Sequence, residues 1–259
     1  MSGNWDTYFC QVDGSPASIL VDLDLAEGAP HAAFPYMGYI SVKVCFPDEH
    51  GLPGQEEYER LGELEDALES AITADDQAVY AGRSASSGHF DFFFYLRSGE
   101  DWGTRAGEVM ATFSEYAWES GRQDDPEWQG YSSFLFPDDY AMNGIQNRRA
   151  LRELAEQGDD GQKSREIEHW AVFSSPEPAA AFSQAVREGG FSLLPEPPVD
   201  SGEEPVFGQL PVGLPEAWVS VRFSRPDTPE DIDAVTYPLV ELVQAHGGAY
   251  QGWACPVVA

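Results

Sequence analysis

The side chains that could carry out acid–base or nucleophilic chemistry are few in this chain and are scattered along it. The cysteines are Cys10, Cys45 and Cys255, and the histidines are His31, His50, His89, His169 and His246. No two of them have the spacing of a zinc site or of a disulfide-exchange motif. Glycine-rich phosphate loops, the GxSxG nucleophile turn and the HExxH zinc motif are also absent. The sequence therefore predicts no catalytic residue, no metal site and no cofactor.

Acidic residues are numerous enough to raise the question of a cation site. Adjacent aspartates occur at 75–76, 124–125, 138–139 and 159–160. Adjacent side chains do not converge well on one ion, and none of these pairs lies in the alternating pattern of a calcium loop. With 45 acidic residues in the chain, adjacent pairs are expected by chance.

One stretch of the second half combines residue types that are suited to binding a protein. It begins with Asp159 and Asp160 and continues from Arg165 through His169 to Trp170. Arg165 is one of few basic residues among many acids, so we expect it to form an ion pair with Asp159 or Asp160. His169 lies in the middle of a predicted strand, where a structural role is the simpler interpretation.

A second such stretch lies near the end of the chain. Gly252 between large aromatic residues predicts a β-bulge or a close approach of two backbones. Tyr250 and Trp253 either form a rigid contact patch of the kind that dominates protein interfaces or are ordinary residues of the last strand. The candidate partner-binding residues are Asp159, Arg165, His169, Trp170, Tyr250, Gln251, Gly252 and Trp253.

The strongest bulk property of the chain is its negative charge. Asp and Glu total 45, Lys and Arg total 14, and the formal net charge is −31. Both halves are acidic, with 25 acidic and 6 basic side chains up to Phe136 and 20 and 8 from Pro137. Such a field repels nucleic acid and anionic lipid and attracts basic proteins. The charge disfavours direct nucleic-acid and membrane binding, and it leaves open whether the acidity serves a partner or only solubility.

The sequence also predicts where the protein works. The first residues contain neither a basic segment nor an apolar one, as a signal peptide would require, and no stretch approaches 18 consecutive apolar residues. Three widely spaced cysteines favour reduced thiols over a disulfide framework. We expect a cytoplasmic protein, and the sequence leaves its oligomeric state open.

The first half of the chain has the residue patterns of an α+β domain. Strands are predicted at 5–12, 18–24, 38–46, 78–83, 89–96 and 128–136, and helices at 61–72 and about 102–119. The first two strands flank the turn residues 13–16 and form a predicted hairpin. Without this hairpin the order is β-α-β-β-α-β, which is typical of ferredoxin-like domains with two helices on one face of an antiparallel sheet.

The second half repeats this order after a predicted boundary at residue 137. Strands are expected at 165–173, 191–194, 217–224 and 249–258, with a short strand at 206–207 in a long loop at 194–215. A helix at 140–157 precedes them, and two further helices begin at Ser175 and Thr228, each with proline at the first helical position. We therefore expect two ferredoxin-like domains in tandem, residues 1–136 and 137–259, the first with an extra N-terminal hairpin.

From about residue 138 onward the chain resembles the RraB family, bacterial protein inhibitors of ribonuclease E. The matching motifs are Gly158-Asp159, Arg165-Glu166-Ile167-Glu168-His169, Gly190-Phe191 and Gly248-Ala249-Tyr250-Gln251-Gly252-Trp253. Members of the family commonly end with Tyr-Asp-Gly-Trp, and this chain has Gln251 in place of that aspartate. The resemblance implies an acidic protein that binds the nuclease and lowers its activity without touching RNA.

The first half resembles another family, the uncharacterised domain-of-unknown-function family 695. The residues that carry this resemblance are Trp5-Asp6-Thr7-Tyr8, Gly51-Leu52-Pro53, Leu61, Leu64, Tyr80-Ala81-Gly82, Phe92-Phe93-Phe94-Tyr95, Trp128, Tyr131 and Leu135-Phe136-Pro137-Asp138. No activity comes with this second resemblance.

Three function classes follow from the sequence. The leading hypothesis is a non-catalytic regulator that binds a protein partner, ribonuclease E or another basic protein. The alternative is an enzyme or small-ligand-binding protein with a site between the two domains, drawing on His50, His89 or His169. A self-assembling module is the third, since sheets of this kind pair through their edges.

Overall fold

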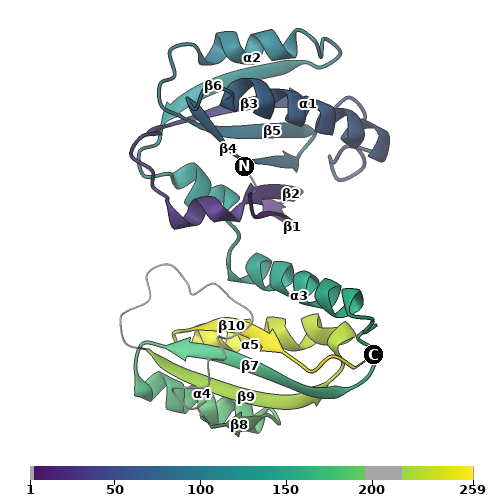
Figure 1. Ribbon diagram of the computed structural model, residues 1–259, viewed down its shortest axis with the longest axis vertical. Coiled ribbons are helices and arrows are strands. Elements are labelled where there is room, and N and C mark those ends of the chain that lie inside the picture. Colours follow the sequence, from purple (N-terminus) through teal and green to yellow (C-terminus); the bar gives the residue numbers. More distant parts are fainter. Residues whose placement is uncertain (1–2, 196–217, 259) are drawn as a thin grey trace. The chain divides into compact units, whose positions relative to one another are not determined.

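The computed structural model describes residues 3–195 and 218–258, and the chain divides into two compact units, Met1–Pro137 and Asp138–Ala259 (Figure 1). The first unit contains a six-stranded sheet and the second a four-stranded sheet, both with antiparallel pairing, which confirms the α+β class. Most of the expected loop at 194–215, with its strand at 206–207, lies outside the described residues. Within the described ranges, no helix has the length and apolar character that crossing a membrane requires.

The sheet of the first unit has the strand order β1-β2-β4-β5-β3-β6. Its strands are β1 (Trp5–Val12), β2 (Ser15–Asp22), β3 (Tyr36–Lys43), β4 (Ala78–Ser86), β5 (His89–Leu96) and β6 (Trp118–Asp124). The β1–β2 hairpin is confirmed, but its turn is shorter than expected. Asp13 and Gly14 alone make the turn, with φ of 51° and 79°, as a two-residue hairpin turn of mirror-image type requires.

Two helices, α1 (Gln55–Thr73) and α2 (Trp102–Met110), cover one face of this sheet (Figure 1). The apolar stripe expected for α1 is confirmed, because the side chains that repeat every three or four residues are fully buried. They are Leu61, Leu64, Leu68 and Ile72. They share one core cluster with Ile40 of β3 and with Phe92 and Phe94 of β5.

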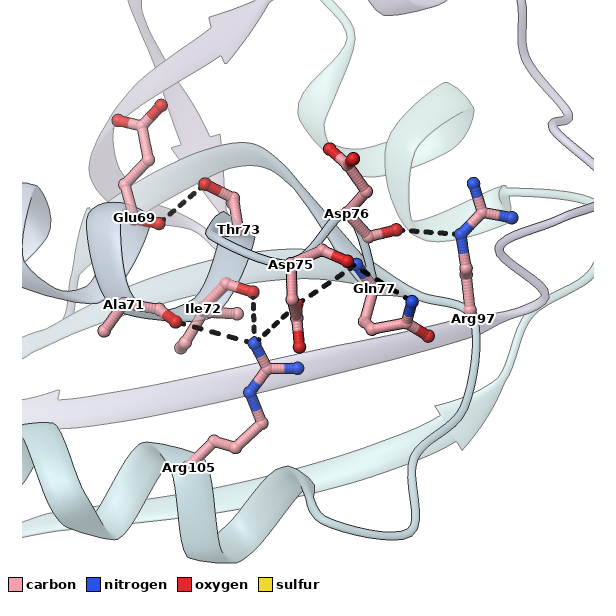
Figure 2. Close-up of polar contacts among 9 residues, drawn as sticks. All are labelled: Glu69, Ala71, Ile72, Thr73, Asp75, Asp76, Gln77, Arg97 and Arg105. Atoms are coloured by element: carbon pink, nitrogen blue, oxygen red, sulfur yellow. Dashed lines mark hydrogen bonds and ion pairs between the residues drawn. The ribbon is translucent and has the colours of Figure 1, made fainter.

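An arginine of α2 supplies a positive charge at the C-terminal end of α1. Acidic α1 has no basic residue in its last turn. Figure 2 shows Arg105 of α2 reaching this end, where its Nη2 donates to the Ile72 carbonyl at 2.7 Å and to Asp75 Oδ1 at 2.9 Å. The guanidinium therefore satisfies a free helix carbonyl and lowers the pKa of the Asp75 carboxyl. Arg97 fixes the following turn by donating to the Asp76 carbonyl at 2.8 Å (Figure 2).

Two expectations for residues 102–136 were wrong. The helix ends at Met110, and the last strand is Trp118–Asp124, whereas Gly130–Leu135 forms a π-helical turn. The strand was missed because β6 lies at the sheet edge and is largely polar and exposed, so it carries no apolar alternation. In the segment after it the buried side chains are Trp128, Tyr131 and Leu135, whose spacing of three and four is helical.

This helical turn packs beneath the sheet around the buried carboxylate of Asp125. Asp125 accepts hydrogen bonds from the Tyr95 hydroxyl at 2.6 Å and from the backbone amides of Gln129 at 2.7 Å and Gly130 at 2.9 Å. Trp128 stacks on the Tyr95 ring, with the ring centroids 3.9 Å apart. Tyr131 reaches the end of β2 through a hydrogen bond to the Asp22 carbonyl at 2.8 Å.

The second unit begins with α3 (Asp139–Glu156) and has the strand order β10-β7-β9-β8. Its remaining elements are β7 (Arg165–Phe173), α4 (Pro176–Glu188), β8 (Ser192–Leu194), β9 (Val219–Asp227), the short helical turn η3 (Pro229–Asp231), α5 (Ile232–Ala245) and β10 (Gly248–Ala254). All three α-helices contribute to the apolar clusters on one face of the sheet, with Ile167, Ala171 and Phe223 on the strand side. When the strands are numbered within each unit, without the β1–β2 hairpin, both sheets have the order 4-1-3-2.

We predict that Asp125→Ala lowers the free energy of unfolding of the first unit by about 3 kcal/mol, because buried donors from Tyr95 and the helical turn lose their acceptor. Asp124→Ala is the matched control, since Asp124 is exposed, and it should change stability by less than about 0.5 kcal/mol. Urea unfolding of both variants measures the difference, and equal effects would contradict the role given to Asp125.

Candidate protein-binding surface

The predicted ion pair of Arg165 forms with Asp159, not with Asp160. Gly158, with φ of 85°, ends α3 and turns the chain so that the Asp159 side chain is fully buried. Arg165 Nη1 lies 2.7 Å from Asp159 Oδ2, and Nη2 donates to Oδ1 at 3.0 Å. Asp160 is exposed and accepts a local hydrogen bond from the Gln162 amide at 3.1 Å. The Nη2 contact is a hydrogen bond and the Nη1 contact an ion pair, and both are shielded from water, where the attraction between opposite charges is least screened.

The Asp159 carboxylate also holds the end of the chain. Its Oδ2 accepts from the Val258 amide at 2.7 Å and its Oδ1 from the Gly161 amide at 2.9 Å. The last strand was expected to reach residue 258 but ends at Ala254, and the amide of Val258 bonds to this carboxylate. The Arg165 hydrogen bonds, followed by the Val258 amide, lower the pKa of Asp159 to about 2.

His169 lies inside the core of the unit. Its ring is fully buried on the helix-covered face, lies nearly parallel to Phe223 with centroids 5.4 Å apart, and contacts the Tyr250 hydroxyl through Nδ1 at 2.8 Å. Burial, with the nearby Arg225 charge, lowers the pKa of His169 to about 3. The imidazole is therefore neutral near pH 7 and presents no charge to a partner.

Trp253 is also buried, beneath α3. Its indole Nε1 donates to Asn147 Oδ1 at 2.7 Å, and the Asn147 amide donates to Thr236 Oγ1 at 2.8 Å and to Asp233 Oδ1 at 2.6 Å. These bonds connect α3, α5 and β10. Trp253 thus holds three elements together, and the exposed aromatic patch that the sequence left open is not formed by it.

Gln251 and Gly252 form the predicted bulge, because the β10–β7 register shifts between Tyr250 and Gly252. Gly252 has φ of 123°, a backbone conformation that residues with a Cβ rarely adopt, which explains the glycine. Gln251 itself is 7% exposed, and the partly buried Tyr250 points to the helix-covered face. The residues at the bulge therefore shape the strand and offer a partner little surface.

The opposite face of the sheet is different. There, side chains of β7 and β9 that point away from the helices pair across the strands and form a polar ladder, Glu166, Glu168, Trp170, Arg222 and Ser224. Arg222 donates to Glu168 Oε2 at 2.7 Å, and its guanidinium lies 5.7 Å from the centre of the Trp170 ring. Ser224 donates to Glu166 Oε1 at 2.6 Å. Glu168, Trp170 and Arg222 are partly exposed and Glu166 is exposed, whereas Ser224 is only 2% exposed. Among the candidate residues, Trp170 is therefore the one that this ladder brings together with other accessible side chains.

The polar ladder is the candidate binding surface of the unit. Tryptophan and arginine are the residues most often responsible for affinity at protein interfaces, and a cross-strand arrangement holds both in fixed positions. Arg222, Glu168 and Ser224 were not selected from the sequence. Their alternation along the strands was visible, but the register that sets Arg222 opposite Trp170 and within reach of Glu168 depends on the pairing of β7 with β9. In the described parts of the chain, no three His, Cys, Asp or Glu side chains are grouped to hold a metal ion.

Comparison with known proteins gives each unit relatives of its own. Residues 3–136 match the family of unknown function DUF695, and residues 144–255 match the family described as regulator of ribonuclease activity B, so both resemblances inferred from the sequence are confirmed. No curated protein matches the chain. A crystal structure of an unknown protein from Galdieria sulphuraria is 12% identical, with 83% of this chain and 95% of that chain covered and a TM-score of 0.22.

We predict that Asp159→Asn destabilises the second unit near neutral pH, since it leaves the buried Arg165 charge without its counterion. The folded-state pKa of about 2 lies below the ordinary 3.8, so the stabilisation is present above pH 3.8 and is lost as the pH falls through about 2. The stability difference between wild type and variant should therefore shrink over that range in urea unfolding at graded pH. Asp160→Asn is the control, and a difference that does not depend on pH would refute the assignment.

Proposed function

The chain belongs to the DUF695 family of unknown function, and we propose that it is a non-catalytic regulator that binds a protein partner through its RraB-like second unit. We infer that the partner is a ribonuclease of the E type or another protein with a basic surface, and that binding takes place in the cytoplasm. The observation that carries the proposal is the match of residues 144–255 to a family of regulators of ribonuclease activity.

Two physical features support this proposal. The second unit, from Pro137 on, has 20 acidic and 8 basic side chains, so it attracts a basic surface and is repelled by free RNA. The polar ladder adds a fixed tryptophan–arginine–glutamate arrangement that a partner can recognise by shape as well as by charge. His169 lies on the other, helix-covered face and is buried and neutral, so it adds no titrating imidazole to this surface.

We also propose that each unit is a ferredoxin-like domain. The 4-1-3-2 strand order shared by both sheets supports this interpretation, as does the helix that follows the first and the third strand of each repeat. The β1–β2 hairpin is an addition to the first domain and α3 an addition to the second. Residues 1–136 and 137–259 are the two domains of the proposal.

An acidic protein that occupies the basic surface of a nuclease competes there with RNA phosphates. Inhibition should then weaken as salt rises, since both the encounter and part of the affinity are electrostatic. The test is a titration of a purified ribonuclease of the E type with the full chain at low and moderate ionic strength, with RNA cleavage and complex formation measured in parallel. Absence of binding at low salt would overturn the choice of this partner.

We predict that Trp170→Ala weakens binding of the nuclease by roughly 10- to 30-fold, the effect of removing one central interface residue. The control is Trp118→Ala, which removes a tryptophan that is 38% exposed in the first unit. Calorimetric titration gives both dissociation constants, and far-ultraviolet circular dichroism verifies that the variants fold. Equal affinities for Trp170→Ala and wild type would exclude the polar ladder as the contact surface.

A further inference from the structure

An apolar pocket of about 170 Å³ lies between the C-terminal half of α3 and the segment that follows β10. Its lining residues are Ala150, Glu153, Leu154, Gln157, Trp253, Ala254, Cys255 and Val257. Among them Glu153 carries the one formal charge, and it lies on the exposed side of α3 with Gln157. The pocket is separate from the polar ladder, because Trp253 and Leu154 belong to the helix-covered side of the sheet.

Buried polar contacts hold the floor and one wall of the pocket in place. The floor is the Trp253 indole, which Asn147 fixes through the 2.7 Å hydrogen bond described above. The wall from Cys255 to Val257 is followed by the Val258 amide, which is tied to Asp159 and through it to Arg165. A pocket built on such anchors exists before a ligand arrives, so binding does not have to order it.

The size and composition of the pocket indicate what it can accept. Ligand and cofactor sites commonly enclose about 300–1,000 Å³, so this volume is small for a cofactor and suits one apolar side chain. Val257 is 44% exposed at the rim and is among the few large apolar residues that the described chain leaves open to water. An exposed apolar rim beside a preformed apolar pocket is typical of a protein contact site.

Charge decides between the possible protein occupants. A second copy of this chain would bring another net charge of −31 to a chain that carries the same charge, which opposes close association. A segment in which basic residues flank an apolar one is attracted by the same field. Glu153 at the rim can pair with a flanking base.

We propose that this pocket binds one apolar side chain, flanked by lysine or arginine, from the protein partner. This inference rests on the proposed function for the identity of the natural partner, but the pocket can be tested without that partner. The polar ladder and the pocket then form two separate contact sites on the second unit. The polar ladder contacts the partner through its charged side chains and the Trp170 ring, and the pocket accepts a single apolar side chain.

Cys255 provides a direct probe of occupancy. Its thiol is partly buried and lines the pocket, so a reagent must enter the pocket to reach it. Burial also raises the pKa of the thiol, which slows its modification. In a Cys10→Ser/Cys45→Ser background it is the remaining thiol of the chain. The rate at which a small uncharged maleimide modifies it therefore reports whether the pocket is filled.

The experiment measures this rate with three synthetic peptides, a leucine flanked by two lysines on each side, the same peptide with alanine at the centre, and the leucine peptide with glutamates as flanks. We expect saturable protection of Cys255 by the leucine–lysine peptide, with weaker or no protection by the other two. Equal protection by all three peptides, or protection by none, would overturn the proposal.

The second arm uses Val257→Lys, which places a positive charge at the rim, and Ala155→Lys, which adds the same charge at an exposed position of α3 outside the lining. Val257→Lys should weaken leucine–lysine peptide binding about 10-fold relative to Ala155→Lys, the loss expected when one central contact is removed. Equal affinities of the two variants, or light scattering that shows dimers dissociated by Val257→Lys alone, would refute a basic partner at this site. Because the peptides replace the nuclease, a failure of the nuclease to bind leaves this result unaffected.

Discussion

The buried ion pair between Asp159 and Arg165 is the interaction on which the second unit depends. The Asp159 carboxylate accepts from the Gly161 amide, from Arg165 at the start of β7 and from the Val258 amide, so the turn between α3 and β7 and a segment 99 residues further along the chain share a single acceptor. A hydrophobic contact could not select this arrangement as sharply, since it has no direction. The Val258 amide supplies one of the donors that the buried Asp159 carboxylate requires.

The first unit also uses a buried carboxylate, that of Asp125, directly after its last strand. Asp125 receives the Tyr95 hydroxyl and the amides of a helical turn and so attaches residues 125–135 beneath the sheet. The two carboxylates differ in charge balance, because Asp159 has a buried guanidinium beside it and Asp125 has neutral donors. In a chain with 45 acidic and 14 basic side chains, carboxylates are the more numerous source of internal hydrogen-bond acceptors. Arg165 and Arg105 both serve the architecture, one inside the core and one at a helix end.

The sequence predicted those features that depend on neighbours along the chain. The stripe of α1, the bulge at Gly252 and an ion pair of Arg165 with Asp159 or Asp160 follow from spacing and from the scarcity of bases, and the structure selects Asp159. Features that depend on distant segments were not predictable in this way. β6 was missed because an edge strand needs no apolar face, and Trp253 was left between surface and core because only the packing of α3 above it decides its burial. The polar ladder likewise required the register of β7 against β9.

In the proposed function, charge and geometry have separate roles in the recognition of a partner by the second unit. A field from a net charge of −31 accelerates encounter with a basic protein, but it acts on every such protein alike and weakens with salt. Selectivity has to come from contacts at short range. The two contacts that we propose are Trp170 with Arg222, which a hydrogen bond to Glu168 fixes, and the pocket floored by Trp253, which a hydrogen bond to Asn147 fixes. A partner that satisfies both must present matching groups at a fixed separation, which few basic surfaces do. In this proposal, the hydrogen bonds that fix these side chains within the fold make the binding of a basic partner specific.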